Sequence, residues 1–113
     1  MYEFSIGEDK TKINYKIERI GKDLDITIIG GKAHIGSLVL ITNNSYNLLN
    51  VANHREDELI IPFIKKFRKY EKGTIVIKAG IHIDNITPQE IKEIMDNNLI
   101  AIKKVEEYIK TLE

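Results

Sequence analysis

The stretch TIVIKAGIHIDNITPQE, residues 74–90, predicts a buried strand that is followed closely by a helix. Apolar side chains recur at every second position over 74–83, so one side of the strand faces a core. Thr87 and Glu90 then have the spacing of a capping box, and Pro88 occupies the first helical position. We therefore expect a central strand and, directly after it, a helix that begins at Pro88.

The first half of the chain alternates apolar and polar residues with a period of two, which is typical of strands with one buried and one solvated face. Short glycine-containing connections between these segments favour antiparallel hairpins. The predicted strands cover residues 2–6, 13–17, 24–28, 37–41 and 46–51.

Apolar residues change to a helical spacing after His54, which predicts a helix with one face on the core. Asp57 is the expected N-cap, and Gly73 is expected to end the helix. Pro62 lies inside this segment, where proline removes a backbone hydrogen bond, so we expect a kink or a later start. The predicted core-facing residues are Leu59, Ile60, Phe63, Ile64, Phe67 and Tyr70.

The C-terminal segment predicts a helix that is interrupted at Asn97 and Asn98. After this pair, a second apolar stripe contains Ile102, Val105 and Ile109 at helical spacing.

These elements predict a single α+β domain over residues 1–113. It is a largely antiparallel sheet of about six strands with two to three helices packed on it, in the order β-β-β-β-β-α-β-α(α). One layer of helices covers one face of the sheet. Because the other face then needs water or a partner, we expect a homodimer.

The composition excludes several classes of protein. The chain has 113 residues, 17 basic and 17 acidic side chains, and no cysteine. Because cysteine is absent, the chain cannot be a zinc ribbon, a disulfide scaffold or an enzyme with a cysteine nucleophile. Its zero net charge argues against the basic surface that nucleic-acid binding requires. No apolar run approaches the roughly 20 residues of a membrane span, and the acidic N-terminal segment is unlike a signal peptide. We expect a cytoplasmic protein that binds neither nucleic acid nor membrane.

Each histidine falls near a predicted strand end or loop, where a rigid sheet can position side chains for binding. His34 lies within GGKAHIG, His54 within NHRED and His82 within GIHIDN. One interpretation makes these three, with Asp84, the ligands of a catalytic zinc or iron site. None of the established short metal spacings is present, so local structural roles are favoured.

The glycine-rich segment 30–36 is a candidate anion site, because backbone N–H groups in such a turn can bind oxyanions. Lys32, Lys78 and His82 would assist. Neither dinucleotide nor P-loop spacing is present, and a strand follows where both motifs need a helix. A bend or bulge in a twisted sheet is the simpler interpretation.

Sequence signals for catalysis are weak. Glu56, Asp57 and Glu58 precede an apolar helix, where acidic residues more often compensate the helix dipole than catalyse. Ser37 and Ser45 lack a nucleophile elbow. A non-catalytic protein is therefore favoured.

Three segments together resemble the prenylated-flavin chaperone (LpdD-like) family: GGKAHIG at 30–36, HREDE at 54–58 and AGIHIDNIT at 79–87. The third is the most specific. The resemblance runs from about residue 30 to the C-terminal helix of the single domain 1–113. Members of that family are small accessory proteins of decarboxylases that use prenylated flavin mononucleotide, and their fold is similar to that of proteasome assembly chaperones. The resemblance implies an antiparallel sheet with packed helices, commonly paired into a dimer.

The resemblance implies a cofactor-handling or assembly role beside a prenylated-flavin-dependent decarboxylase, with prenylated FMN or FMN as the implied ligand. It also implies functional positions at Glu56 and Asp57. Combined with the anion-site interpretation, the candidate cofactor-binding residues are Gly31, Lys32, His34, Gly36, His54, Lys78, Gly80, His82, Asp84 and Asn85.

Two alternatives stay open beside the accessory role. The first is a small metal-dependent hydrolase or lyase with a histidine-based site. The second is an interaction module similar to proteasome assembly chaperones, in which a sheet edge or a helix face pairs with a partner.

Overall fold

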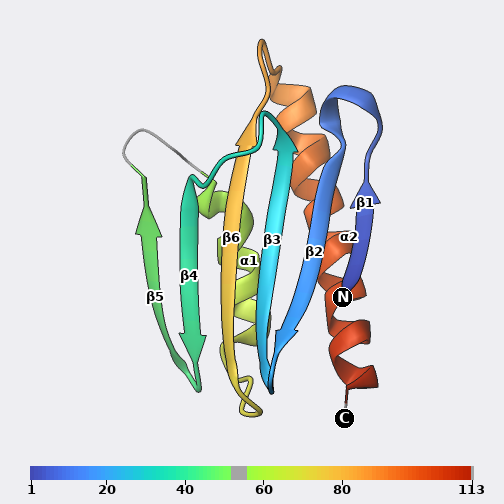
Figure 1. Cartoon of the computed structure of the whole chain (residues 1–113). Helices are drawn as coiled ribbons and strands as arrows, with labels where there is room; N and C mark the ends of the chain where they lie inside the picture. Colours follow the sequence, from blue (N-terminus) through green and yellow to red (C-terminus); the bar gives the residue numbers. More distant parts are fainter. Residues whose placement is uncertain (52–55, 113) are drawn as a thin grey trace.

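In the part of the chain that the structure describes, six strands form one sheet in the order β1-β2-β3-β6-β4-β5, and two long helices cover one of its faces (Figure 1). The computed structural model describes residues 1–51 and 56–112. The predicted α+β class and element order are confirmed. The elements are β1 (Tyr2–Ile6), a 3-10 turn η1 (Asp9–Thr11), β2 (Ile13–Ile20), β3 (Asp23–Gly31), β4 (Ser37–Thr42), β5 (Ser45–Asn50), α1 (Asp57–Phe67), β6 (Thr74–His82) and α2 (Pro88–Thr111).

Strand β6 lies inside the sheet, as its apolar alternation predicts. It pairs in parallel with β3, for example Leu24 with Ile75, and antiparallel with β4, for example Ile41 with Ile75. The other strand pairs are antiparallel, so the sheet is largely antiparallel with one parallel junction. The chain therefore leaves β3, builds β4, β5 and α1, and only then returns to fill the space between β3 and β4.

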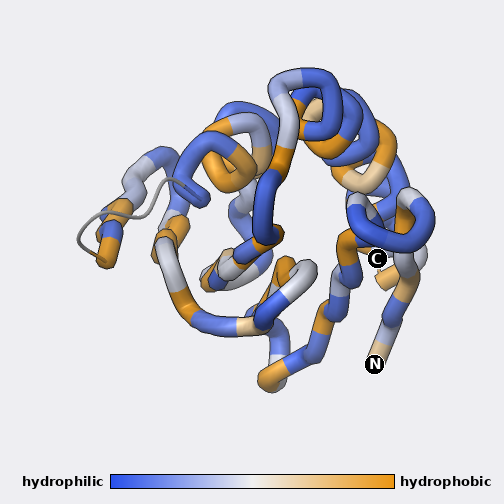
Figure 2. Tube along the Cα trace, turned by 90° about the horizontal axis from the view of Figure 1, so that it is seen from above, coloured by the Kyte–Doolittle hydropathy of each residue, from blue (hydrophilic) through white to orange (hydrophobic). Residues whose placement is uncertain are grey.

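The core lies between the sheet and the helices. Seen from above, both helices lie on the same side of a strongly curved sheet (Figure 2). The inward positions of β2, β3, β4 and β6 are almost completely buried, as are the apolar stripes of α1 and α2. Removing this surface from water stabilises the fold by roughly 25 cal/mol per Å² of apolar area. Within the described residues, no helix is both long and apolar enough to cross a membrane.

Helix α1 differs from the sequence prediction at both ends. Asp57 is not the N-cap: the helix begins at this residue, and Glu56 precedes it without a side-chain capping hydrogen bond. The helix runs through Pro62, so the expected later start is wrong; its buried stripe holds the segment against the sheet despite the missing N–H. It ends at Phe67, well before Gly73, which instead packs closely against the backbone of Lys22.

Helix α2 begins at Pro88 with the predicted capping box but is not interrupted at the asparagine pair. Asn98 is fully buried and lies among the apolar residues of α2 that face the core. Its Oδ1 accepts a hydrogen bond of 2.8 Å from the hydroxyl of Tyr15, and its Nδ2 donates one of 3.0 Å to the carbonyl of Leu59. One asparagine thus joins β2, α1 and α2 inside the core, and burial raises the pKa of Tyr15 above its usual value.

Candidate functional site

The connection between β3 and β4, residues 32–36, crosses β6 on the face of the sheet that the helices leave open (Figure 1). The N–H of Lys32 donates to the carbonyl of His82 at 2.9 Å, and the N–H of Gly36 donates to the carbonyl of Ala79 at 2.8 Å. Between these points a Cβ on Gly80 would overlap the carbonyl oxygen of His34. The glycine of β6 therefore lets the 32–36 loop lie directly on the strand, which is the close approach expected of glycine within a strand.

Glu56 lies beneath the same loop. Its carboxylate occupies the space where a Cβ on Gly36 would be, so a larger residue at position 36 would displace the end of the Glu56 side chain. The side chain of Glu56 is only 7% exposed, and its Oε1 lies 2.9 Å from Nε2 of His34. The same oxygen accepts a hydrogen bond of 3.4 Å from the N–H of Ile81. Glu56 thus joins the loop, the start of α1 and the end of β6.

A second polar group lies beside the loop and is open to solvent. Nε2 of His82 is 3.0 Å from Oδ1 of Asp84, and Nζ of Lys32 is 3.7 Å from Oδ2 of the same carboxylate. The side chain of His82 is 55% exposed, that of Asp84 is 67% exposed, and that of Lys32 is 77% exposed. Such exposed pairs contribute little stability, so a bound ligand can compete for them at low cost.

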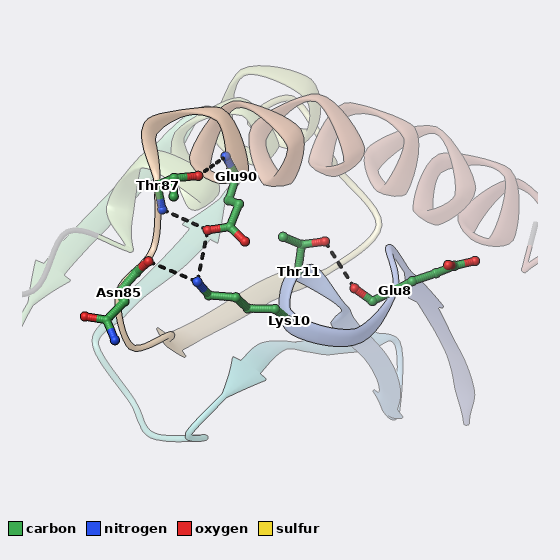
Figure 3. A network of polar contacts seen from close by, with 6 residues as sticks. All are labelled: Glu8, Lys10, Thr11, Asn85, Thr87 and Glu90. Carbon is green, nitrogen blue, oxygen red and sulfur yellow. Dashed lines mark hydrogen bonds and ion pairs between the residues drawn. The ribbon is translucent and has the colours of Figure 1, made fainter.

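The β6–α2 connection, which carries Asp84, is held by Lys10 of η1 (Figure 3). Nζ of Lys10 donates to the carbonyl of Asn85 at 3.0 Å and lies 3.1 Å from Oε1 of Glu90. That carboxylate also accepts the N–H of Thr87 at 2.9 Å, while Thr87 Oγ1 accepts the N–H of Glu90 at 3.1 Å. The Thr87 N–H, and secondarily Lys10, lower the pKa of Glu90. The capping box therefore fixes the connection as well as the helix start.

An apolar pocket of about 360 Å³ opens at the same end of the molecule, between the starts of both helices and the end of β6. Its volume lies in the range of pockets that bind ligands or side chains. It is lined by Glu56, Glu58, Leu59, Ile81, Ile86, Ile91, Ile94 and Met95.

The structure brings most, but not all, of the predicted site residues together. Gly31 pairs with His82 across the β3–β6 junction, beside the loop. Lys78 lies on the same face of β6 as Gly80, but it forms an ion pair of 3.1 Å with Asp25. His54 lies outside the described residues.

The histidine-based metal site finds no support within residues 1–51 and 56–112. In these ranges no three histidine, cysteine, aspartate or glutamate side chains are grouped as a metal ion would require. Lys10 and the apolar pocket were missed by the sequence analysis. Lys10 lies in an ordinary polar turn, 75 residues from its partner Asn85, and no local pattern signals such a contact.

The fold and this loop arrangement can be compared with known proteins. The model of the prenylated flavin chaperone LpdD-like domain matches residues 7–110, which is nearly the whole described chain. The chain belongs to the LpdD-like prenylated flavin chaperone family. The match includes β2 and β3, which carry no signature recognisable by eye, whereas β1 lies outside it.

Among solved structures, this LpdD-like chain is similar to a chain of a chaperone complex for yeast 20S proteasome assembly. The TM-score is 0.50 at 10% sequence identity, and the similarity covers 98% of each chain. At this identity the similarity concerns the fold alone. No curated protein sequence matches the chain.

Proposed function

We propose that this LpdD-like protein is a non-catalytic accessory protein that handles the flavin cofactor of a prenylated-flavin-dependent decarboxylase. The observation that carries the proposal is the family match over residues 7–110. We also propose that the protein is located in the cytoplasm.

The proposed cofactor surface is formed by the 32–36 loop and the start of the β6–α2 connection. Lys32 and His82 are exposed and contact different oxygens of one carboxylate, that of Asp84. A phosphate group carries the same sign as Asp84 and is a stronger acceptor, so the flavin phosphate can replace this carboxylate as their partner. His34, fixed by Glu56, holds the loop against β6 and keeps Lys32 in place.

Titration with FMN and with prenylated FMN, followed by flavin fluorescence, tests this proposal. We expect saturable binding that weakens by about tenfold in His82→Ala and in Lys32→Ala, because each loses a charge-assisted contact worth about 1.5 kcal/mol. Lys103→Ala, an exposed lysine on α2, is the matched control and should bind as the wild type does. No binding of either flavin, together with no decarboxylase in a pull-down, would contradict the proposal.

The proposal includes a homodimer, formed through the free edge of β5. Residues 35–53 contain no charged side chain, in a chain that is 30% charged. Edge strands usually carry charges that discourage pairing with another chain. In β5, Leu49 is 62% exposed and Tyr46 47% exposed. An uncharged edge of this kind pairs most readily with an equally uncharged edge, which a second copy supplies.

Light scattering after size exclusion tests the dimer. Leu49→Lys is expected to shift the protein from dimer to monomer at micromolar concentration, because two copies would bring two lysines to one interface. Ile20→Lys, at a site of similar exposure (61%) near the end of β2, should leave the dimer intact. A wild-type monomer, or equal behaviour of both variants, would refute dimerisation through β5.

A further inference from the structure

Asp84 contacts both of the side chains that the proposed cofactor surface offers to a phosphate. Its Oδ1 lies 3.0 Å from Nε2 of His82, and its Oδ2 lies 3.7 Å from Nζ of Lys32. Because an ionised carboxylate only accepts hydrogen bonds, both of these groups face it as donors. Asp84 therefore already occupies, from within the chain, the two donors that a bound phosphate would use.

The backbone around Asp84 is held in place by hydrogen bonds. Lys10 donates to the carbonyl of the next residue, Asn85, at 3.0 Å, and the same ammonium group contacts the capping box of α2 (Figure 3). On the other side, the carbonyl of His82 accepts the N–H of Lys32 at 2.9 Å, which fixes the two donors relative to each other. The carboxylate is thus tethered beside both donors at a high effective concentration.

A tethered carboxylate affects some anions more than others. A carboxylate from solution would replace Asp84 with a group of equal charge, and it would lose its own translational freedom on binding. A phosphate monoester carries a charge of about −1.5 to −2 at pH 7 and has three acceptor oxygens, so its attraction to the same donors is stronger. Competition by Asp84 therefore favours phosphate monoesters over carboxylates.

We propose that Asp84 is the specificity-determining residue of this surface, acting as an internal competitor that excludes carboxylates and admits the phosphate of a flavin mononucleotide. This inference rests on the proposed function, because the ligand is the same flavin phosphate. It gives Asp84 the opposite effect from that of a cofactor ligand, since removing its charge strengthens binding. Affinity differences between related complexes are mostly differences in dissociation rate, so the competitor also shortens the time for which the flavin stays bound.

Flavin fluorescence with the full chain tests the effect of Asp84→Asn. We expect FMN to bind about fivefold more tightly to this variant than to the wild type, because two exposed ion pairs no longer compete with the phosphate. Riboflavin, which has no phosphate, should not distinguish the two proteins. Asp96→Asn is the matched control: Asp96 is 60% exposed, pairs with Lys92 at 2.7 Å on α2 and loses the same charge, yet should leave FMN affinity unchanged.

Two outcomes of this titration overturn the competitor and leave the cofactor role intact. The first is FMN binding to Asp84→Asn that is equal to or weaker than binding to the wild type, since loss of a flavin contact would weaken binding. The second is an equal gain of affinity in Asp96→Asn, which would show that the overall charge of the protein is responsible.

Inorganic phosphate and acetate, followed through the NMR signals of the His82 ring, test the competitor without flavin. Phosphate should shift these signals at a lower concentration in Asp84→Asn than in the wild type, and acetate should shift them only in the variant. Identical responses of the two proteins overturn the competitor. If the predicted phosphate and acetate responses are seen but no flavin binds to either protein, the cofactor role fails and the competitor stands.

Discussion

Replacing Asn98 with alanine is expected to lower the free energy of unfolding by about 2–4 kcal/mol. The change removes one acceptor and one donor from the core at once. The hydroxyl of Tyr15 and the carbonyl of Leu59 then lose their partners in a place that water does not reach. Since domains of this size have only about 5–15 kcal/mol of stability in total, urea unfolding followed by circular dichroism will show the loss clearly.

The neighbouring asparagine supplies the control. Asn97→Ala changes the same residue type one position earlier in α2, where the side chain is only half-buried, and should alter stability by less than about 0.5 kcal/mol. Tyr15→Phe should cost about 1 kcal/mol. In the double variant with Asn98→Ala, the loss should be smaller than the sum, because the two residues share one hydrogen bond. Additive losses would show that the buried contact does not couple β2 to α2.

Replacing Gly80 with alanine is expected to cost about 2–3 kcal/mol and to weaken flavin binding at the same time. The added methyl group would occupy the position of the His34 carbonyl oxygen, and backbone on both sides leaves no flexible group to move aside. The 32–36 loop must therefore lift off β6. This displaces Lys32 from Asp84 and His34 from Glu56.

Gly21→Ala separates this effect from ordinary glycine strain. Gly21 has a φ of +61° in the β2–β3 turn, and no atom lies within 4 Å of an added Cβ. Alanine there should cost about 1–2 kcal/mol through its backbone conformation alone and should leave FMN affinity unchanged. If Gly80→Ala bound FMN as well as Gly21→Ala does, the loop on β6 would have no part in binding.

Local sequence patterns predicted the elements well where a single periodicity governed each one. The alternation in β2, β3 and β6 and the capping box at Thr87 reflect local chemistry, and all appear in the structure. The errors arose where tertiary contacts override local preference. Asn98 interrupts an apolar pattern, but two hydrogen bonds from distant elements satisfy it, so the helix continues. Pro62 is tolerated because the stripe around it is buried.

The sequence indicated which residues belong to the candidate site better than it indicated which of them contact one another. Glycine beside histidine marked the two segments that meet, because Gly36 and Gly80 permit close approach. Which groups meet was not predictable: the contact of His34 with Glu56 depends on the loop crossing β6, and the sequence does not encode that path locally. The contact of Lys10 with Asn85 and the apolar pocket both depend on how distant elements come together, so no local pattern predicts them.

The late position of β6 in the chain has a consequence for synthesis. Its neighbours β3 and β4 are complete by residue 42, whereas β6 begins only at Thr74. At a translation rate of about 5–20 residues per second, the uncharged β4–β5 hairpin waits seconds for the strand that ties it to β3. During that interval both of its edges are open to other nascent chains. Until residue 82 has left the ribosome, the β4–β5 hairpin therefore lacks the strand that covers the inner edge of β4.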